Sequence, residues 1–371
     1  MEKKEWNILI GIALVFGILY FMPSATDWFR ISITSAFDLL HEYAKQHVLT
    51  CLVPALFIAG AISVFIKKEK VMKYLGYEAK QYVSYGVASI SGAILAVCSC
   101  TILPLFAGIR KRGAGLGPAI TFLFAGPAIN IAAIFLTMSV LGLKIGLARV
   151  ISAVSLSIIV GLSMQFIFRE KPEKGKMLVQ ETKASRISNK VLIAFFGLMI
   201  GVLVVNGLQI SKTTKYLLMA IFTICVVGLV VWKFRDHVAK TWLEETWNFS
   251  KTILPLLFIG VFIAGFVMPL LPATLIQNLV GQNTILGNLI ASIFGAFMYF
   301  STLTEVPIIQ ALMAKGMNSG PALALLLAGP SLSLPCMLVL RKVLGTQKTA
   351  VYVGLVIAYS TIAGLIFGSL P

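Results

Sequence analysis

Long apolar runs separated by short polar segments dominate the pattern of this chain. A helix needs about 20 apolar residues to cross the hydrocarbon core of a bilayer. Runs of suitable length fall at 6–22, 47–66, 117–141, 146–168, 191–210, 216–232, 252–271, 320–340 and 349–369. Two further apolar stretches, 84–109 and 285–312, are interrupted by Pro104 and Pro307. The pattern predicts an all-α, polytopic membrane protein.

Part of the chain is an internal duplicate. Residues 88–131 align without a gap onto residues 291–334, at a constant offset of 203 positions. The matched residues are largely helix breakers within apolar sequence, such as Gly126–Pro127 and Gly329–Pro330. Paired Gly/Pro-interrupted segments in two halves indicate a transporter binding site.

The basic loops predict an orientation, because cytoplasmic loops carry an excess of Lys and Arg. Lys3 and Lys4 place the N-terminus in the cytoplasm, and the loops at 67–73 and 110–112 lie on the same side. The stretch 84–109 then enters and returns as a re-entrant hairpin, with its turn near residues 98–104. Segment 252–271 runs outward, so the second copy is inverted relative to the first. Three single charges depart from this scheme: Lys144, Arg149 and Lys315.

We therefore expect two inverted-topology repeats with broken, re-entrant helical hairpins. The expected units are an N-terminal transmembrane helix with an outside loop (1–34), repeat 1 with its hairpin (35–168, hairpin 84–109), a cytoplasmic linker (169–190), linking transmembrane helices (191–239), and repeat 2 with its hairpin (240–371, hairpin 285–312).

Composition supports a membrane location and argues against nucleic acid. Of 371 residues, 58% are hydrophobic and only 12% are charged, against about 25% charged in soluble domains. The net charge of +17 resides in short loops, where basic residues set orientation and meet anionic lipid. The sequence contains no P-loop or dinucleotide fingerprint. We expect no nucleic-acid partner, no cofactor and no direct use of ATP.

The helix breaks predict where the site lies. Non-helical backbone at membrane depth is tolerated inside protein or beside a water-filled cavity, and proline removes a backbone donor. Breaks at Pro104, Gly126–Pro127, Pro307 and Gly329–Pro330 would converge near the midplane and form a cavity and gate. The alternative is four ordinary proline kinks in a structural bundle.

The first hairpin tip reads VCSCTILP and carries thiols. Cys98 and Cys100 point the same way if the tip is extended and apart if it is helical. In the extended case they could bind a soft solute, since thiolates suit soft partners. The alternative is a cysteine acting as a small buried apolar residue. We expect no metal site, because His41, His47 and His237 lie near helix ends and loops, where a surface position is more typical than metal ligation.

The second tip reads FSTLTEVP and carries a carboxylate. Glu305 is the one acidic residue within the apolar stretches of either repeat, and an ionisable residue at membrane depth is a functional hypothesis by default. Desolvation favours the neutral carboxyl, so we expect Glu305 to exchange a proton. The alternative is an interfacial carboxylate paired with Lys315.

Other polar residues near the breaks are candidates for solute contact. Around the two tips these are Ser99, Thr101, Thr302 and Thr304. In the two broken helices they are Asn130, Ser331 and Ser333. The residues in the broken helices either bind substrate or satisfy freed backbone carbonyls, and the sequence leaves both readings open.

Three motifs resemble those of a known protein family. The C-S-C-T-x-L-P tip (98–104) and the G-P-A-I-N (126–130) and G-P-S-L-S (329–333) runs resemble a predicted-permease family that includes the ArsP organoarsenical permeases and YraQ-like proteins. The resemblance covers roughly residues 40–370. It implies a multi-spanning inner-membrane permease and, for ArsP-type members, export of trivalent organoarsenicals through cysteine contacts.

The leading hypothesis is a secondary transporter, not an enzyme, that exports a small soft solute such as a trivalent organoarsenical, by proton antiport through Glu305. It would be a multi-pass protein of a prokaryotic inner (plasma) membrane, as a homo-oligomer or with an accessory subunit. Three alternatives stay open: a divalent metal or other inorganic ion permease, a channel-like subunit of a membrane complex, and an intramembrane enzyme. The last lacks a histidine base in the aligned repeat segments, 88–131 and 291–334.

Overall fold

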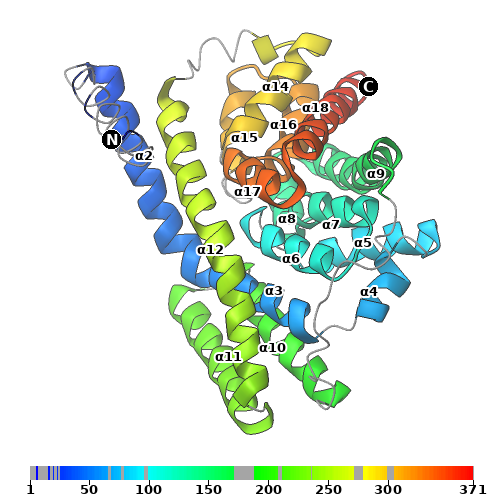
Figure 1. Ribbon diagram of the computed structural model, residues 1–371. Coiled ribbons are helices and arrows are strands. Elements are labelled where there is room, and N and C mark those ends of the chain that lie inside the picture. The colour runs from blue at the N-terminus through cyan, green and yellow to red at the C-terminus, as the bar shows by residue number, and fades with distance from the viewer. Residues whose placement is uncertain are drawn as a thin grey trace.

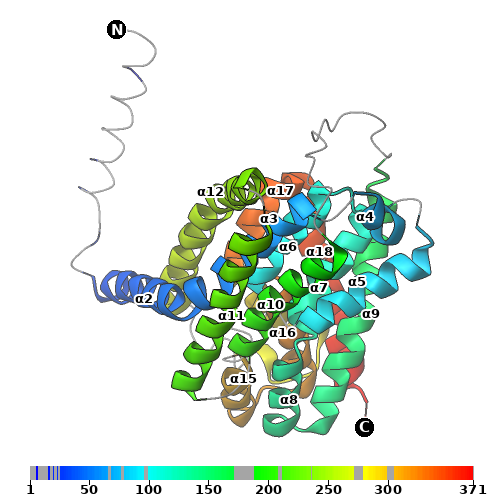
Figure 2. The ribbon, with the colours of Figure 1, turned by 90° about the horizontal axis from the view of Figure 1, so that it is seen from below.

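A computed structural model gives the fold (Figures 1 and 2). It describes residues 26–65, 68–76, 79–95, 99–170, 188–207, 211–234, 236–270, 279–298 and 305–370, with a few isolated residues nearer the N-terminus. These segments contain helices and turns and no strand, which confirms the all-helical fold class for the described part of the chain. The expected span 6–22 lies outside these segments.

The elements before the linking helices are α2 (Asp27–Tyr43), a π-helical segment η1 (Ala44–Leu52), α3 (Val53–Phe65), α4 (Lys68–Leu75), α5 (Gln81–Leu95), α6 (Ser99–Lys111), α7 (Leu116–Ala128), α8 (Ile131–Val140) and α9 (Leu143–Ile167). The linking helices are α10 (Asn189–Gly207) and α11 (Lys212–Lys233). The remainder comprises α12 (Asp236–Val267), the short η2 (Met268–Leu270), α14 (Ile285–Phe297), α15 (Glu305–Ala314), α16 (Ser319–Ser331), α17 (Leu334–Leu344) and α18 (Thr346–Gly368).

Several helices are long and apolar enough to cross a membrane. Within the described residues, four single helices qualify: Leu143–Ile167, Thr213–Lys233, His237–Val267 and Thr346–Gly368. Two bent pairs, α7 with α8 and α16 with α17, also qualify if each pair is one span. The chain is therefore a multi-pass membrane protein.

The 203-position offset recurs in the backbone. Helix α7 and helix α16 have the same length and bounds 203 positions apart. Gly113 and Gly316 both adopt a positive φ, at 92° and 102°, as do Gly142 and Gly345, at 93° and 88°. Because left-handed backbone favours glycine, the repeated glycines place the same turns in both copies.

Matched glycines also bring helices into close contact. A Cβ added to Gly161 of α9 would lie 2.8 Å from the carbonyl oxygen of Gly117 in α7. A Cβ added to Gly364 of α18 would lie 2.6 Å from the carbonyl oxygen of Gly320 in α16. These distances are too short for a real Cβ, so each copy uses a glycine pair to pack α7 against α9 and α16 against α18, as small residues do in membrane bundles.

Both Gly-Pro segments precede a bend. Helix α7 contains Pro127 in its last turn, and α8 is inclined to α7 by 47°. Helix α16 contains Pro330 in its last turn, and α17 is inclined to α16 by 49°. The bends follow the prolines by one to four residues, where the chain leaves α16 in extended geometry at Leu332 and Ser333.

The two hairpin prolines lie within helices. Pro104 is the sixth residue of α6, and that helix continues to Lys111. Pro307 is the third residue of α15, a position where the missing N–H has no helical partner to lose. Neither proline therefore ends the helix that contains it: α6 begins at Ser99 and α15 at Glu305, ahead of the two prolines.

Two groups of helices can be distinguished in space. Figure 1 shows α14 to α18 together above α5 to α9, while the 32-residue α12 lies along one side against α2. In Figure 2, α2 lies at one edge and α5 and α9 at the opposite edge. Helix α16 contacts both α7 and α9, and α18 contacts α9, so the two copies meet along their broken helices and the long helices that follow.

Candidate functional site

A buried ion pair joins the two copies of the repeat. Glu305, the first residue of α15, is 1% exposed, and Arg149 of α9 is fully buried. Nη2 of Arg149 lies 3.8 Å from Oε2 of Glu305. This distance gives an ion pair without a hydrogen bond. An ionised residue in such a position is costly and marks a candidate functional site.

Helix α8 positions the guanidinium. Arg149 Nη1 donates a hydrogen bond of 2.9 Å to Oγ1 of Thr137, and this hydroxyl donates in turn to the carbonyl oxygen of Ala133, at 2.6 Å. Within the described residues, Nε and Nη2 of Arg149 and Oε1 of Glu305 make no hydrogen bond. Within the described residues, one guanidinium nitrogen of the pair is therefore fixed by a hydrogen bond, while Nε, Nη2 and Oε1 make none.

The broken helix α16 forms one wall of this site. A Cβ added to Gly329 would lie 3.9 Å from Cδ of Glu305, so the glycine backbone faces the carboxylate. Gly295 of α14 packs on the same backbone, since its added Cβ would lie 3.1 Å from the nitrogen of Gly329. The expected gate residue Gly329 thus lies beside the carboxylate expected to carry a proton.

Asn130 and Ser333 begin equivalent helices. Asn130 Oδ1 accepts from the backbone nitrogen of Ala133, at 3.4 Å, just before α8. Ser333 Oγ accepts from the backbone nitrogen of Cys336, at 3.3 Å, at the start of α17. Both residues are buried and 203 positions apart. Each caps the helix that follows a bend, which satisfies backbone donors freed by the break.

Ser331 lies at the other side of the second bend. Its hydroxyl is buried and makes no hydrogen bond within the described residues. Its carbonyl oxygen accepts from the hydroxyl of Tyr352, at 3.2 Å. A side chain from α18 thus satisfies a carbonyl that the helix break sets free.

The two hairpin tips are described only in part. Ser99 and Thr101 are buried in the first turn of α6. Cys100 belongs to the same helix, but its side chain lies outside the described part of the chain. The whole residues Cys98, Thr302 and Thr304 lie outside it too. Among the described cysteines, Cys336 of α17 is buried and Cys225 of α11 is exposed. The described residues contain no cluster of three His, Cys, Asp or Glu side chains that could hold a metal ion.

Arg149 is the functional candidate that sequence reasoning missed. The loop-charge pattern treats Arg149 as an outside exception, and Lys315 as the alternative partner of Glu305. The structure instead buries Arg149 against Glu305 and leaves Lys315 exposed. A signal was present: Arg149 interrupts an apolar run at 146–168, and a charge within such a run calls for a buried partner.

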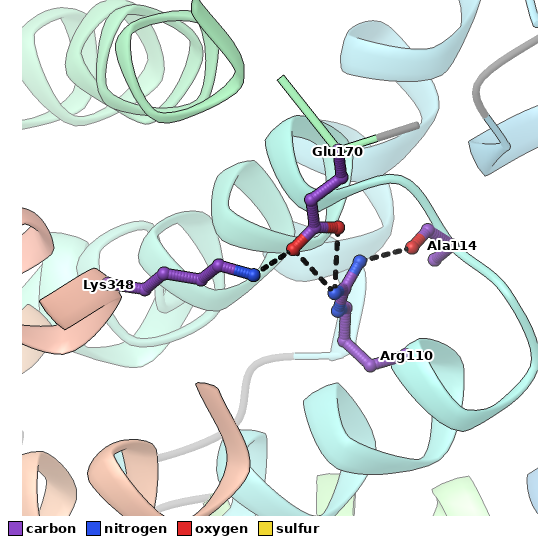
Figure 3. Close-up of polar contacts among 4 residues, drawn as sticks. All are labelled: Arg110, Ala114, Glu170 and Lys348. Carbon is purple, nitrogen blue, oxygen red and sulfur yellow. Dashed lines mark hydrogen bonds and ion pairs between the residues drawn. The ribbon is translucent and has the colours of Figure 1, made fainter. Parts of the chain in front are cut away.

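A second charged cluster lies away from this pair. The carboxylate of Glu170 lies between Arg110 and Lys348 and bonds to both, with an Arg110 Nη2 to Oε2 distance of 3.0 Å (Figure 3). Arg110 Nη1 also donates to the carbonyl oxygen of Ala114, at 2.8 Å. Lys111, the residue after Arg110, forms an ion pair with Glu245 of α12. Arg110, Lys111 and Glu170 belong to segments that the loop pattern places in the cytoplasm.

Comparison with known proteins identifies the family. A family model described as a predicted permease matches residues 33–369. The chain belongs to this family of predicted permeases. It is 48% identical, over 88% of its length and 93% of the relative's, to the UPF0718 protein MJ0584 of Methanocaldococcus jannaschii. It is 22% identical to the UPF0718 protein YraQ of Escherichia coli K12, over 89% and 80% of the two chains. No solved structure matches.

Membership confirms the resemblance carried by the sequence motifs. It makes the chain a membrane permease, with a small molecule or ion as its substrate, and favours a transporter over an enzyme. The buried pair lies where the two copies of this permease meet, so it is the centre on which a transport mechanism can be built.

Proposed function

We propose that this permease is a proton-coupled secondary transporter built from two inverted repeats, with the Arg149–Glu305 pair at its centre. The observation that carries the proposal is the burial of one acidic and one basic side chain, from different copies, against the broken helix α16. Buried ion pairs contribute little net stability, so a role in transport explains this one better than a role in folding.

The inversion is supported by two independent patterns. Turns, helix bounds and glycine contacts repeat at an offset of 203 positions. The loop charges give the two copies opposite directions across the membrane, with the N-terminus in the cytoplasm of a prokaryote. In this topology Glu305 begins a ten-residue helix that leads outward, which places it about 15 Å from the outer surface, near the midplane.

Glu305 is the proposed proton carrier. Its Oε1 makes no hydrogen bond within the described residues, and its Oε2 has only the distant guanidinium. When Glu305 is ionised, Arg149 balances its charge. When it is protonated, the attraction is lost and the two copies are less firmly joined. Proton binding at one residue would then favour the rearrangement that moves the site from one side to the other.

The proposed solute is a small soft molecule, with a trivalent organoarsenical as the specific candidate. Cys98 and Cys100 would contact it, because thiolates prefer soft partners. The proposed polar contacts around them are Ser99, Thr101, Asn130, Thr302, Thr304, Ser331 and Ser333. The segments around Pro104 and Pro307, with the bends that follow Gly126–Pro127 and Gly329–Pro330, would shape the cavity and the gate.

The Glu170 cluster is the proposed cytoplasmic closure. Arg110 follows the first hairpin, Glu170 ends the helix α9 segment and Lys348 begins α18 of the second copy. A carboxylate shared by both copies would hold the cytoplasmic ends together (Figure 3). Opening toward the cytoplasm would require that this contact break. The assembly could be a homo-oligomer or include an accessory subunit.

Uptake into everted membrane vesicles tests the function. We expect a pH gradient, acid inside, to drive methylarsenite uptake. Glu305→Gln should abolish this acceleration, and Cys98→Ser/Cys100→Ser should abolish uptake itself. Cys225→Ser is the matched control, because Cys225 is exposed on α11. Uptake by Glu305→Gln that still follows the pH gradient would refute proton coupling, and uptake by the double serine variant would refute the thiol contact.

A further inference from the structure

The guanidinium of Arg149 has two donor nitrogens, Nε and Nη2, that make no hydrogen bond within the described residues. We propose that Arg149 binds a small oxyanion, either a carboxylate or a tetrahedral oxyanion, when Glu305 is protonated. The permease would then accept anionic solutes together with a proton, in addition to soft neutral ones. The proton step of this inference rests on the proposed function, while the anion site rests on the geometry of Arg149.

The free donors have the geometry that an oxyanion requires. Thr137 occupies Nη1, and the remaining two nitrogens, Nε and Nη2, make no hydrogen bond within the described residues. These two nitrogens share one edge of the guanidinium plane. Their N–H bonds are parallel, and this edge binds carboxylate and phosphate in a bidentate manner. Arg149 is fully buried, so water from the bulk does not satisfy this edge.

Glu305 does not fill the donor edge. Its Oε2 is 3.8 Å from Nη2, beyond hydrogen-bond distance, and its Oε1 also makes no hydrogen bond within the described residues. Buried polar atoms without partners cost about 1–3 kcal/mol each. An oxyanion at Nε and Nη2 would satisfy both donors, and the hydroxyl of a protonated Glu305 could donate to the same anion.

The charge balance favours anion binding when Glu305 is protonated. With Glu305 ionised, the pair is neutral and an added anion would be repelled. With Glu305 protonated, Arg149 carries an uncompensated positive charge in a buried site, which is strongly unfavourable. One bound proton and one bound monovalent anion restore neutrality. Anion binding should therefore strengthen as pH falls, because acid removes the competing carboxylate.

Comparison of the two repeat copies indicates that folding does not require the positive charge of Arg149. The position equivalent to Arg149 is Tyr352, and the position equivalent to Glu305 is Ile102, each 203 positions away. Both equivalents are fully buried and neutral. The Tyr352 hydroxyl donates a hydrogen bond to the backbone carbonyl oxygen of Ser331. The same helix position thus folds with a neutral side chain in one copy, whereas the other copy keeps a five-donor cation.

Equilibrium binding to the purified, detergent-solubilised protein tests the inference. Titration calorimetry would use inorganic phosphate and acetate as probes, with chloride at equal ionic strength as the control. We expect one anion per chain and tighter binding at acidic than at alkaline pH. Glu305→Gln should bind the anion at all pH values. Arg149→Lys should weaken binding about tenfold or more, because lysine lacks the parallel donor pair. Tyr352→Phe is the matched control and should bind normally.

The outcomes separate this inference from the proposed function. Binding of phosphate or acetate is measured without transport, so a protein that binds them yet moves no proton would refute only the proposed function. Proton-driven methylarsenite uptake without anion binding in wild type and in Glu305→Gln would refute the oxyanion site. Should Arg149→Lys fail to fold, the loss of pH dependence in Glu305→Gln still decides the matter. Preference for phosphate over acetate, or the reverse, identifies which oxyanion class the site takes.

Discussion

Arg149 and Glu305 form an ion pair between the two copies of the internal repeat, with 3.8 Å between Nη2 and Oε2. Their repeat equivalents, Tyr352 and Ile102, are buried and uncharged. The backbone of this permease is thus duplicated, whereas the buried charges of Arg149 and Glu305 have no counterpart at the equivalent positions. Many transporters alternate between two faces by means of repeated scaffolds, and the proposed proton coupling requires chemically distinct groups within such a scaffold. The pair supplies this asymmetry.

Removing one partner of the pair should be worse than removing both. Arg149→Met leaves a buried carboxylate alone, and loss of one partner of a buried pair costs about 3–5 kcal/mol. The double variant Arg149→Met/Glu305→Leu should recover most of this loss, because neither charge is then buried. The measurement is chemical unfolding in detergent, completed as a double-mutant cycle with Glu305→Leu. Additive effects of the two single changes would mean that the charges do not interact.

The glycine contacts should limit helix packing in both copies. Gly161→Ala and Gly364→Ala introduce a Cβ at 2.8 Å and 2.6 Å from a carbonyl oxygen on the facing helix. Overpacking of this kind costs about 1–3 kcal/mol. Gly354→Ala is the matched control, because no heavy atom lies within 4 Å of its added Cβ, and it should stabilise the helix slightly. Thermal unfolding of the three variants in one detergent measures the difference.

If Gly161→Ala and Gly364→Ala unfold at the same temperature as Gly354→Ala, the broken helices do not pack as closely as the glycine pairs indicate. If only one is destabilised, the two copies differ in packing despite their matching sequence.

The Glu170 cluster should affect conformation more than stability. Its ion pairs are partly exposed, and such pairs contribute about 0–1 kcal/mol. Glu170→Gln should therefore unfold nearly as the parent does. It should nevertheless expose Ala114, which is buried and bonded to Arg110 through its carbonyl oxygen. Labelling of Ala114→Cys by an impermeant maleimide in everted vesicles measures this exposure.

The control for that experiment is Glu244→Gln, since Glu244 lies exposed on α12. Equal labelling of Ala114→Cys with Glu170→Gln and with Glu244→Gln would show that the cluster does not close the cytoplasmic side. High salt should reproduce the effect of Glu170→Gln in the parent, because it screens partly exposed ion pairs.

The sequence predicts the scaffold of the site better than its chemistry. Breaking residues such as Gly329–Pro330 and turn glycines such as Gly113 recur at a fixed offset, and local backbone preference largely decides what they do. Pro104 and Pro307 lie within α6 and α15 and do not end them; for Pro307, the third residue of α15, this costs little because the first N–H groups of a helix have no helical partner. The pairing of Arg149 with Glu305 depends on tertiary packing across 156 positions, and no local pattern contains it.

Two roles of Asn130, helix capping and contact with the solute, can be distinguished by substitution. Asn130→Ser keeps a side-chain oxygen that can accept from the nitrogen of Ala133, and serine caps helices about as well as asparagine. We expect its stability to stay within about 0.5 kcal/mol of the parent, while Asn130→Ala loses about 1 kcal/mol. Serine lacks the amide group, so methylarsenite uptake should fall in both variants if that group contacts the solute. Uptake by Asn130→Ser equal to that of the parent, measured in everted vesicles, would leave Asn130 with a capping role alone and remove it from the proposed binding site.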